Sequence, residues 1–174
     1  MNPCVGMGDQ SKEVRMRHVV RLFSYVAVGA LVLTATAVPV SADDLDTNRF
    51  QVTERTGTQR FEDVGKPGAS VGDSVTYMQR LFHHGNRVGR EDGRCDVTQS
   101  IKSTVTNHCM FTLTFGARGQ IAVQGTFVLD FKRSSAVNVL AITGGTGAYN
   151  GAAGSIRVMT AKGEPNRVQV RLQD

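Results

Sequence analysis

A glycine-rich turn near the end of the chain has the residue types of a phosphate-binding loop. The segment LAITGGTGAYNG, residues 140–151, runs from an apolar stretch into closely spaced glycines. Dinucleotide-binding loops need glycines at fixed offsets, followed by a helix whose amides face phosphate. Gly145 and Gly147 match the first two offsets, but Asn150 occupies the third and the following residues alternate like a strand. We therefore expect no nucleotide site, and we interpret Gly144, Gly145 and Gly147 as structural glycines of a strand junction.

Two cysteines have the spacing of a disulfide across a hairpin. Strands over residues 94–101 and 104–115, turning around Lys102, would place Cys95 opposite Cys109. Facing residues of an antiparallel pair approach disulfide distance. The alternative is a pair of reduced, buried thiols, and an oxidising compartment would favour the bridge.

The sequence gives only weak indications of a metal site or of a polyanionic partner. His83 and His84 are adjacent, so on a strand they point to opposite faces, and no third ligand is evident nearby. We interpret them as a solvated strand end and expect no metal or cofactor. The formal net charge is +5, but the basic residues are scattered and there is no Trp and no recognisable nucleic-acid module. This pattern indicates a basic surface without a nucleic-acid partner.

The N-terminal segment has the parts of a secretory signal peptide. Basic side chains between Lys12 and Arg21 precede an uncharged run, Leu22–Val40, and a small-residue site that ends at Ala42. We expect residues 1–42 to be a signal peptide cleaved after Ala42. Residues 43–174 would then form one secreted domain that is not associated with a membrane. The alternative is a retained anchor, since the run is just long enough to span a bilayer.

Short alternating runs separated by glycine, proline, asparagine or aspartate dominate the rest of the chain, and they are typical of all-β structure. There are eight: Phe50–Glu54, Ser74–Phe82, Cys95–Gln99, Phe111–Phe115, Ile121–Phe131, Val137–Thr143, Ser155–Thr160 and Val168–Leu172. Strands that are apolar on one face and polar on the other predict an eight-stranded antiparallel β-barrel. The interior of such a barrel is filled by side chains or holds one small ligand.

Four segments, in order, resemble the allene oxide cyclase barrel family, to which dirigent proteins are related. They are residues 72–82, 93–95, 115–125 and 140–151. The resemblance covers roughly residues 50–158 and implies a calycin-like barrel. The cyclases are trimers that hold an unsaturated fatty-acid epoxide in an apolar cavity and steer its ring closure, whereas dirigent proteins hold phenolic radicals or quinone methides. For this chain it implies a small hydrophobic partner, oriented for reaction, and a homotrimer.

The resemblance also points to cavity residues on one strand. Val75, Tyr77 and Gln79 match a cyclase strand whose inward side chains line the cavity, and their alternate spacing independently places them on one face. Gln79 stands where the family has asparagine, and Cys95 matches a cavity cysteine. We add Phe115 as a candidate, with ordinary barrel packing as the alternative for the aromatic residues.

Three further matches leave catalysis open. Gln51 falls at a cyclase glutamate, Thr53 at an asparagine and Phe127 at a cavity tyrosine. A carboxylate in a dry cavity can transfer a proton, whereas a glutamine amide cannot. The first hypothesis is therefore a barrel that binds a small hydrophobic molecule and steers its cyclisation or coupling, as an isomerase does. The alternative is a non-catalytic extracellular binding or structural module.

We predict that the exported protein begins at Asp43, because the small-residue site ends at Ala42. N-terminal sequencing of secreted protein checks this. A chain that still begins at Met1, Met7 or Met16 would contradict the cleavage and support the anchor.

Overall fold

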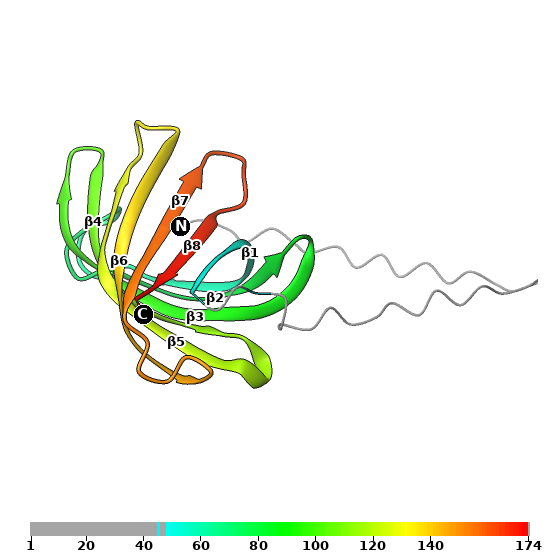
Figure 1. Cartoon of the computed structure of the whole chain (residues 1–174). Helices are drawn as coiled ribbons and strands as arrows, with labels where there is room; N and C mark the ends of the chain where they lie inside the picture. The colour runs from blue at the N-terminus through cyan, green and yellow to red at the C-terminus, as the bar shows by residue number, and fades with distance from the viewer. Residues whose placement is uncertain (1–44, 46–47, 174) are drawn as a thin grey trace, which may run out of the picture. The chain divides into compact units, whose positions relative to one another are not determined.

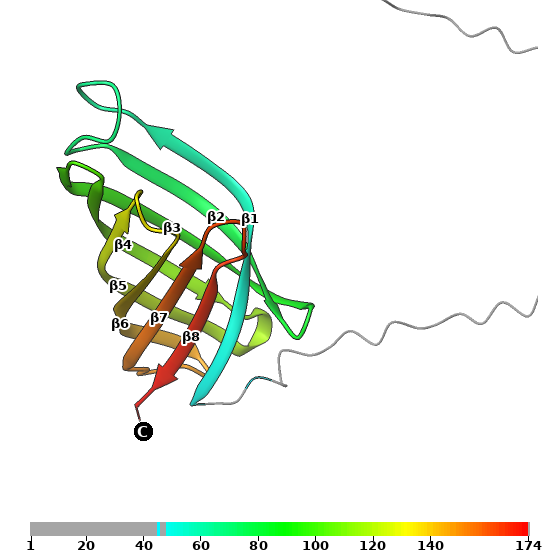
Figure 2. The ribbon, with the colours of Figure 1, turned by 90° about the horizontal axis from the view of Figure 1, so that it is seen from above.

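Eight antiparallel strands close into a barrel in the computed structural model, which describes Leu45 and residues 48–173 (Figures 1 and 2). The strands are β1 (Arg49–Glu62), β2 (Ser74–His83), β3 (Asn86–Ile101), β4 (Thr104–Thr114), β5 (Gly119–Asp130), β6 (Ser135–Gly147), β7 (Gly154–Ala161) and β8 (Arg167–Leu172). Each pairs with its neighbours in sequence, and β1 pairs with β8. The predicted fold class is confirmed.

The expected signal peptide, residues 1–42, lies outside the described residues. Within the described part of the chain, no helix has the length and apolar character needed to cross a membrane. Its one helical element is the short 3-10 turn η2 (Gly116–Arg118), which links β4 to β5.

Two strands extend well beyond the runs that the sequence predicted. β3 begins at Asn86, not near Cys95, and β1 continues from Glu54 to Glu62. The added half of β3 is rich in glycine and charge, which are poor strand formers. It is held on both sides, because Arg90 pairs with Arg80 of β2 and with Thr114 of β4. Tertiary pairing thus overrides a weak local preference.

Aromatic side chains fill one end of the barrel. Phe50 and Phe115 meet edge to face with their ring centroids 5.4 Å apart, and Tyr149 packs against Phe115 at 5.7 Å. All three side chains are buried. Phe115, which the sequence offered as a cavity residue, therefore belongs to this packed end.

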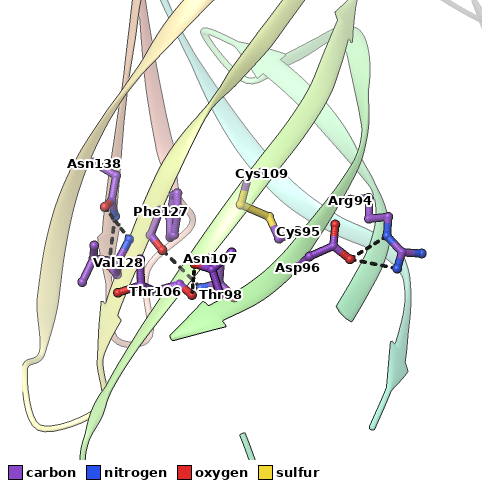
Figure 3. Close-up of a disulfide and its surroundings, with 10 residues drawn as sticks. All are labelled: Arg94, Cys95, Asp96, Thr98, Thr106, Asn107, Cys109, Phe127, Val128 and Asn138. Atoms are coloured by element: carbon purple, nitrogen blue, oxygen red, sulfur yellow. Dashed lines mark hydrogen bonds and ion pairs between the residues drawn. A yellow bond between two sulfur atoms is a disulfide. The ribbon is translucent and has the colours of Figure 1, made fainter. Parts of the chain in front are cut away.

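The predicted disulfide between Cys95 and Cys109 is confirmed (Figure 3). The two cysteines are direct partners in the β3–β4 ladder, with their Cα atoms 4.0 Å apart. The turn is made by Lys102 and Ser103, and a bulge between Val97 and Gln99 shifts the register by the one residue that brings the cysteines together. Closing a loop of this size stabilises the folded state by about 3 kcal/mol in the chain-entropy model.

The wall between β5 and β6 is completed by a side chain. Backbone pairing joins Gly119–Gln124 only to the second half of β6. Further along β5, the side-chain amide of Asn138 from β6 replaces the backbone pairing. Its Oδ1 accepts from the Val128 N–H at 2.8 Å, and its Nδ2 donates to the Val128 carbonyl at 3.2 Å (Figure 3). Asn138 is buried, so one amide satisfies the backbone groups that a strand would otherwise have paired.

The glycine-rich turn joins β6 to β7, and its glycines are not equivalent. A Cβ on Gly145 would collide with the carbonyl oxygens of Tyr149 and Gln120. Gly147 has φ +64° and a neighbouring carbonyl, that of Arg118. The expectation is wrong for Gly144, because a Cβ there would meet nothing within 4 Å.

We predict that Gly145→Ala destabilises the protein by more than about 1 kcal/mol, because backbone must move to admit the new Cβ. Gly144→Ala is the matched control one residue away, and we expect it to change the free energy of unfolding by less than about 0.5 kcal/mol. Denaturant unfolding of both variants checks this. Equal effects would remove the close-approach explanation.

Candidate functional site

A cavity of about 380 Å³ lies inside the barrel. Its wall is largely apolar with a few polar groups, which is typical of small-molecule sites. The lining residues are Glu54, Val75, Tyr77, Gln79, Glu91, Cys95, Asn107, Cys109, Phe111, Phe127, Leu129, Val158, Thr160 and Asn166. Six strands contribute facing side chains, so the closed sheet itself shapes the cavity.

Four of the residues predicted from the sequence line this cavity. Val75, Tyr77 and Gln79 occupy alternate positions of β2 and share its inner face, and Phe127 enters from β5. The disulfide also forms part of the wall, and beside it the Asn107 side chain donates to the Phe127 carbonyl at 3.2 Å (Figure 3). Contact of these residues with a ligand stays a prediction.

Gln51 and Thr53 lie on the other face of β1. The Gln51 side chain is exposed, and its Oε1 accepts a hydrogen bond from Gln169 at 3.0 Å. Phe50, Val52 and Glu54 are the buried residues of this strand. Because side chains alternate along a strand, the odd positions here cannot reach the interior. The structure therefore does not bring Gln51 and Thr53 to the cavity.

Two carboxyl groups that the sequence reasoning missed face each other in the interior. Glu54 of β1 is 4% exposed and Glu91 of β3 is 2% exposed. They flank β2, where Leu81 is the partner of Glu54 and Gln79 is the partner of Glu91. The two side chains are hydrogen bonded to each other. The interior therefore contains two carboxyl groups, although Gln51 supplies none.

The environment favours a proton on Glu91. Burial, and next the negative charge and hydrogen bond of Glu54, raise the pKa of Glu91 well above its usual range. The Tyr77 hydroxyl donates to Glu91 and partly opposes this. Burial and the nearby carboxyl groups raise the pKa of Tyr77, so the phenol stays a neutral donor. The result is a chain of donors from Tyr77 to Glu91 to Glu54.

One oxygen of Glu91 has no partner. Oε2 is buried and makes no hydrogen bond with any described residue. An unsatisfied buried carboxyl oxygen is costly. Glu91 therefore keeps unused hydrogen-bonding capacity in the interior.

Asn166, just before β8, holds Glu54 in place. Its Nδ2 donates to Glu54 Oε2 at 3.0 Å, and its carbonyl accepts from the Glu54 N–H at 2.9 Å. Two bonds from one residue fix both the backbone and the carboxylate of Glu54. The orientation of the carboxyl pair therefore depends on the β7–β8 connection.

No metal centre emerges among the residues that the structure describes, since they contain no group of three or more His, Cys, Asp or Glu side chains able to hold an ion. His83 instead uses Nδ1 in a 2.8 Å contact with the Gln51 carbonyl oxygen, and its ring meets that of His84 edge to face, with the centroids 4.1 Å apart.

The fold is that of a known family. The family profile described as "Allene oxide cyclase barrel like domain" matches residues 47–172, and the chain belongs to this family. The resemblance identified from the sequence is confirmed. Among proteins with curated descriptions, no sequence matches this chain.

Solved structures with the same barrel include three with different activities. A pyocyanin demethylase shares 26% identity, with a TM-score of 0.64 over 72% of this chain and 99% of that chain. AbnU, an exo-specific intermolecular Diels-Alderase, shares 17% identity, with a TM-score of 0.54 over 71% of this chain and 97% of that chain. A pterocarpan synthase dirigent protein shares 14% identity, with a TM-score of 0.53 over 71% of this chain and 91% of that chain. The last two establish the likeness of fold alone.

We predict that Glu91→Gln alters how stability depends on pH. A carboxyl group whose pKa is raised on folding stabilises the protein below its ordinary pKa of about 4.3, and this stabilisation is lost as the pH rises through the folded-state value. The wild type should therefore lose stability relative to Glu91→Gln as the pH increases from about 4 to about 9. Denaturant unfolding across this range measures the difference.

The exposed Glu164→Gln is the control, and its curve should run parallel to the wild type. Asp73 and Asp130, whose pKa values are lowered by hydrogen bonds, have the opposite effect at acid pH. They are present in every variant and cancel in the comparison. Parallel curves for Glu91→Gln would show that Glu91 is ionised in the folded protein.

Proposed function

We propose that this barrel binds one small, largely apolar molecule in its interior and promotes cyclisation or coupling of that molecule by acid–base assistance. One observation carries the proposal: a hydrogen-bonded carboxyl pair with a tyrosine donor, Glu54, Glu91 and Tyr77, projects into an apolar cavity of about 380 Å³. We also propose, from the signal-peptide pattern and the family, that the protein is exported and forms a homotrimer.

The cavity supports the binding step. Its volume falls in the range of about 300–1,000 Å³ that is usual for small-molecule sites. Apolar atoms make up most of the wall surface, and Phe111, Phe127 and Val158 are among the residues that supply them. A flexible substrate held there would lose the conformations that do not lead to ring closure, which is a source of rate acceleration in itself.

The carboxyl pair supports the chemical step. Glu91 can donate its proton to a carbonyl, epoxide or quinone-type oxygen of the substrate while the new bond forms. The Glu54–Glu91 pair then recovers one proton from the product, so the isomerisation needs no external acid and no oxidant. Positioned groups of this kind contribute about 10²–10⁴-fold to rate. Tyr77, as a neutral donor, stabilises the carboxylate left on Glu91 during the transfer.

Structures of the same fold support ring formation as the reaction class. AbnU is a Diels-Alderase, and the dirigent protein is a pterocarpan synthase. They show that this barrel can host such reactions in other chains.

A second candidate function is removal of a methyl group from pyocyanin or a related aromatic heterocycle. It is favoured by the pyocyanin demethylase, which combines 26% identity with a match over 99% of its own length. Incubation with pyocyanin, followed by chromatography for the demethylated product, distinguishes the two reactions. The non-catalytic carrier differs from both in retaining its ligand unchanged.

The test begins with mass spectrometry of small molecules that co-purify with the protein from its native source. The retained molecule or its precursor then serves as substrate for wild type and Glu91→Gln. We predict that Glu91→Gln lowers kcat by about 10²–10⁴-fold. Tyr77→Phe should have a smaller effect, because its hydroxyl acts through Glu91, and the exposed Glu164→Gln should match the wild type.

Turnover by Glu91→Gln at the wild-type rate would exclude the acid–base role. A tightly retained molecule that is released unchanged would support the carrier. If no molecule co-purifies and none of the tested substrates binds, the proposed function is wrong.

A further inference from the structure

We propose that this cavity selects its ligand by charge, taking a conjugated organic cation in preference to a neutral molecule of the same shape and rejecting the anion. The inference rests on the proposed function, because it concerns the substrate class of the same site. It is carried by the charges of the residues that line the route into the barrel.

A second chamber adjoins the first. It has a volume of about 310 Å³ and shares Val75, Cys95, Asn107 and Leu129 with the inner cavity. Two of its other lining residues, Phe61 and Phe131, are each 69% exposed. The outer chamber is therefore the solvent-facing approach to the carboxyl pair.

All ionisable side chains of the two linings, apart from Tyr77, are carboxyl groups. Glu54 and Glu91 line the inner chamber, and Glu62, Asp63 and Asp73 line the outer one. No Lys, Arg or His is among the residues that line either chamber. A ligand thus meets negative charge along the whole route.

The charges of the outer chamber are only partly compensated. Arg60 and Arg94 each approach Glu62 at 3.9 Å, from largely exposed positions. Asp73 accepts hydrogen bonds from the backbone N–H groups of Val64 at 2.8 Å and Ser70 at 2.7 Å. These bonds lower the pKa of Asp73, so the carboxylate stays charged.

In the inner chamber the negative charge of the pair has no cationic counterpart. Glu54 receives a hydrogen bond from the Asn166 amide, which is neutral. The low dielectric of the interior strengthens attraction for a positive ligand and repulsion of a negative one. A carboxylate ligand would also give up its hydration without gaining a cationic partner.

The aromatic wall suits a positive charge that is spread over rings. Tyr77, Phe111 and Phe127 line the inner chamber, and aromatic faces attract cations. A compact ammonium ion would lose more hydration than a delocalised heterocyclic cation on entering this apolar space. A fatty acid, the substrate class implied by resemblance to the cyclases, would bring a carboxylate that none of these lining residues can neutralise.

Three molecules of nearly the same shape test the proposal: the N-methylphenazinium cation, neutral phenazine and the phenazine-1-carboxylate anion. Their dissociation constants are measured by calorimetry or fluorescence at neutral pH and low salt. We expect the cation to bind at least about tenfold tighter than phenazine, and the anion at least about tenfold weaker, each a difference of about 1.4 kcal/mol.

The variant Glu54→Gln removes the charge while keeping the shape of the side chain. We expect its preference for the cation over phenazine to fall to about twofold or less, while phenazine still binds and confirms that the barrel is folded. Glu164→Gln, an exposed carboxylate outside both chambers, should keep the wild-type ratio. Raising the salt concentration should weaken the preference only slightly, because buried charges are poorly screened.

Equal affinity of the three molecules would overturn charge selection and leave the proposed function intact, since binding itself is demonstrated. Tighter binding of the anion, or an unchanged cation preference in Glu54→Gln, would also overturn it. If none of the three binds, charge selection among such molecules is refuted, and the mass-spectrometric search for a retained ligand decides the proposed function separately.

Discussion

The short ladder between β1 and β8 closes the barrel, and the interior depends on it. Five residue pairs form this closure, from Arg49 with Arg171 to Thr53 with Arg167. The next residue of β1 is Glu54, whose N–H and carboxylate both bond to Asn166. The closing ladder and the fixing of a charged group in the cavity are thus one continuous set of contacts. Without closure, Glu54 would face water and lose the burial that gives the carboxyl pair its chemistry.

Burying two carboxyl groups in an apolar interior opposes folding unless their polar atoms are paired. The chain meets this requirement incompletely. Tyr77 and Asn166 donate to the pair, yet Glu91 Oε2 stays unpaired. A hydrophobic residue in place of Glu91 would avoid this cost, so stability does not account for the carboxyl group, whereas the acid–base role proposed above would. The disulfide and the packed aromatic end supply stability elsewhere in the barrel.

The fold could be predicted from the sequence because alternation of apolar and polar residues is a local property. Each of the eight predicted runs overlaps an observed strand. The spacing of Cys95 and Cys109 about the turn was also enough to predict that they face each other. Four cavity residues could be predicted as well, but the carboxyl pair could not, because it depends on register between strands. A bulge between Thr56 and Thr58 and another between Leu81 and Phe82 decide which residues of β1, β2 and β3 meet. Glu54 shares the even-numbered, inward face of its strand with Phe50 and Val52, and this alternation was the one feature of the sequence that pointed to it. Glu91 lay outside the predicted strand.

The Asn138 amide also has a consequence for contacts between molecules. Where β5 runs on without a backbone partner in β6, its edge could accept a strand from another chain, and the nearby Val137 and Val139 are exposed enough to stabilise such an addition. Asn138 occupies both the N–H and the carbonyl of Val128. An incoming strand would have to displace it before it could continue the sheet. One buried side chain thereby protects an incomplete seam of the barrel against edge-to-edge aggregation.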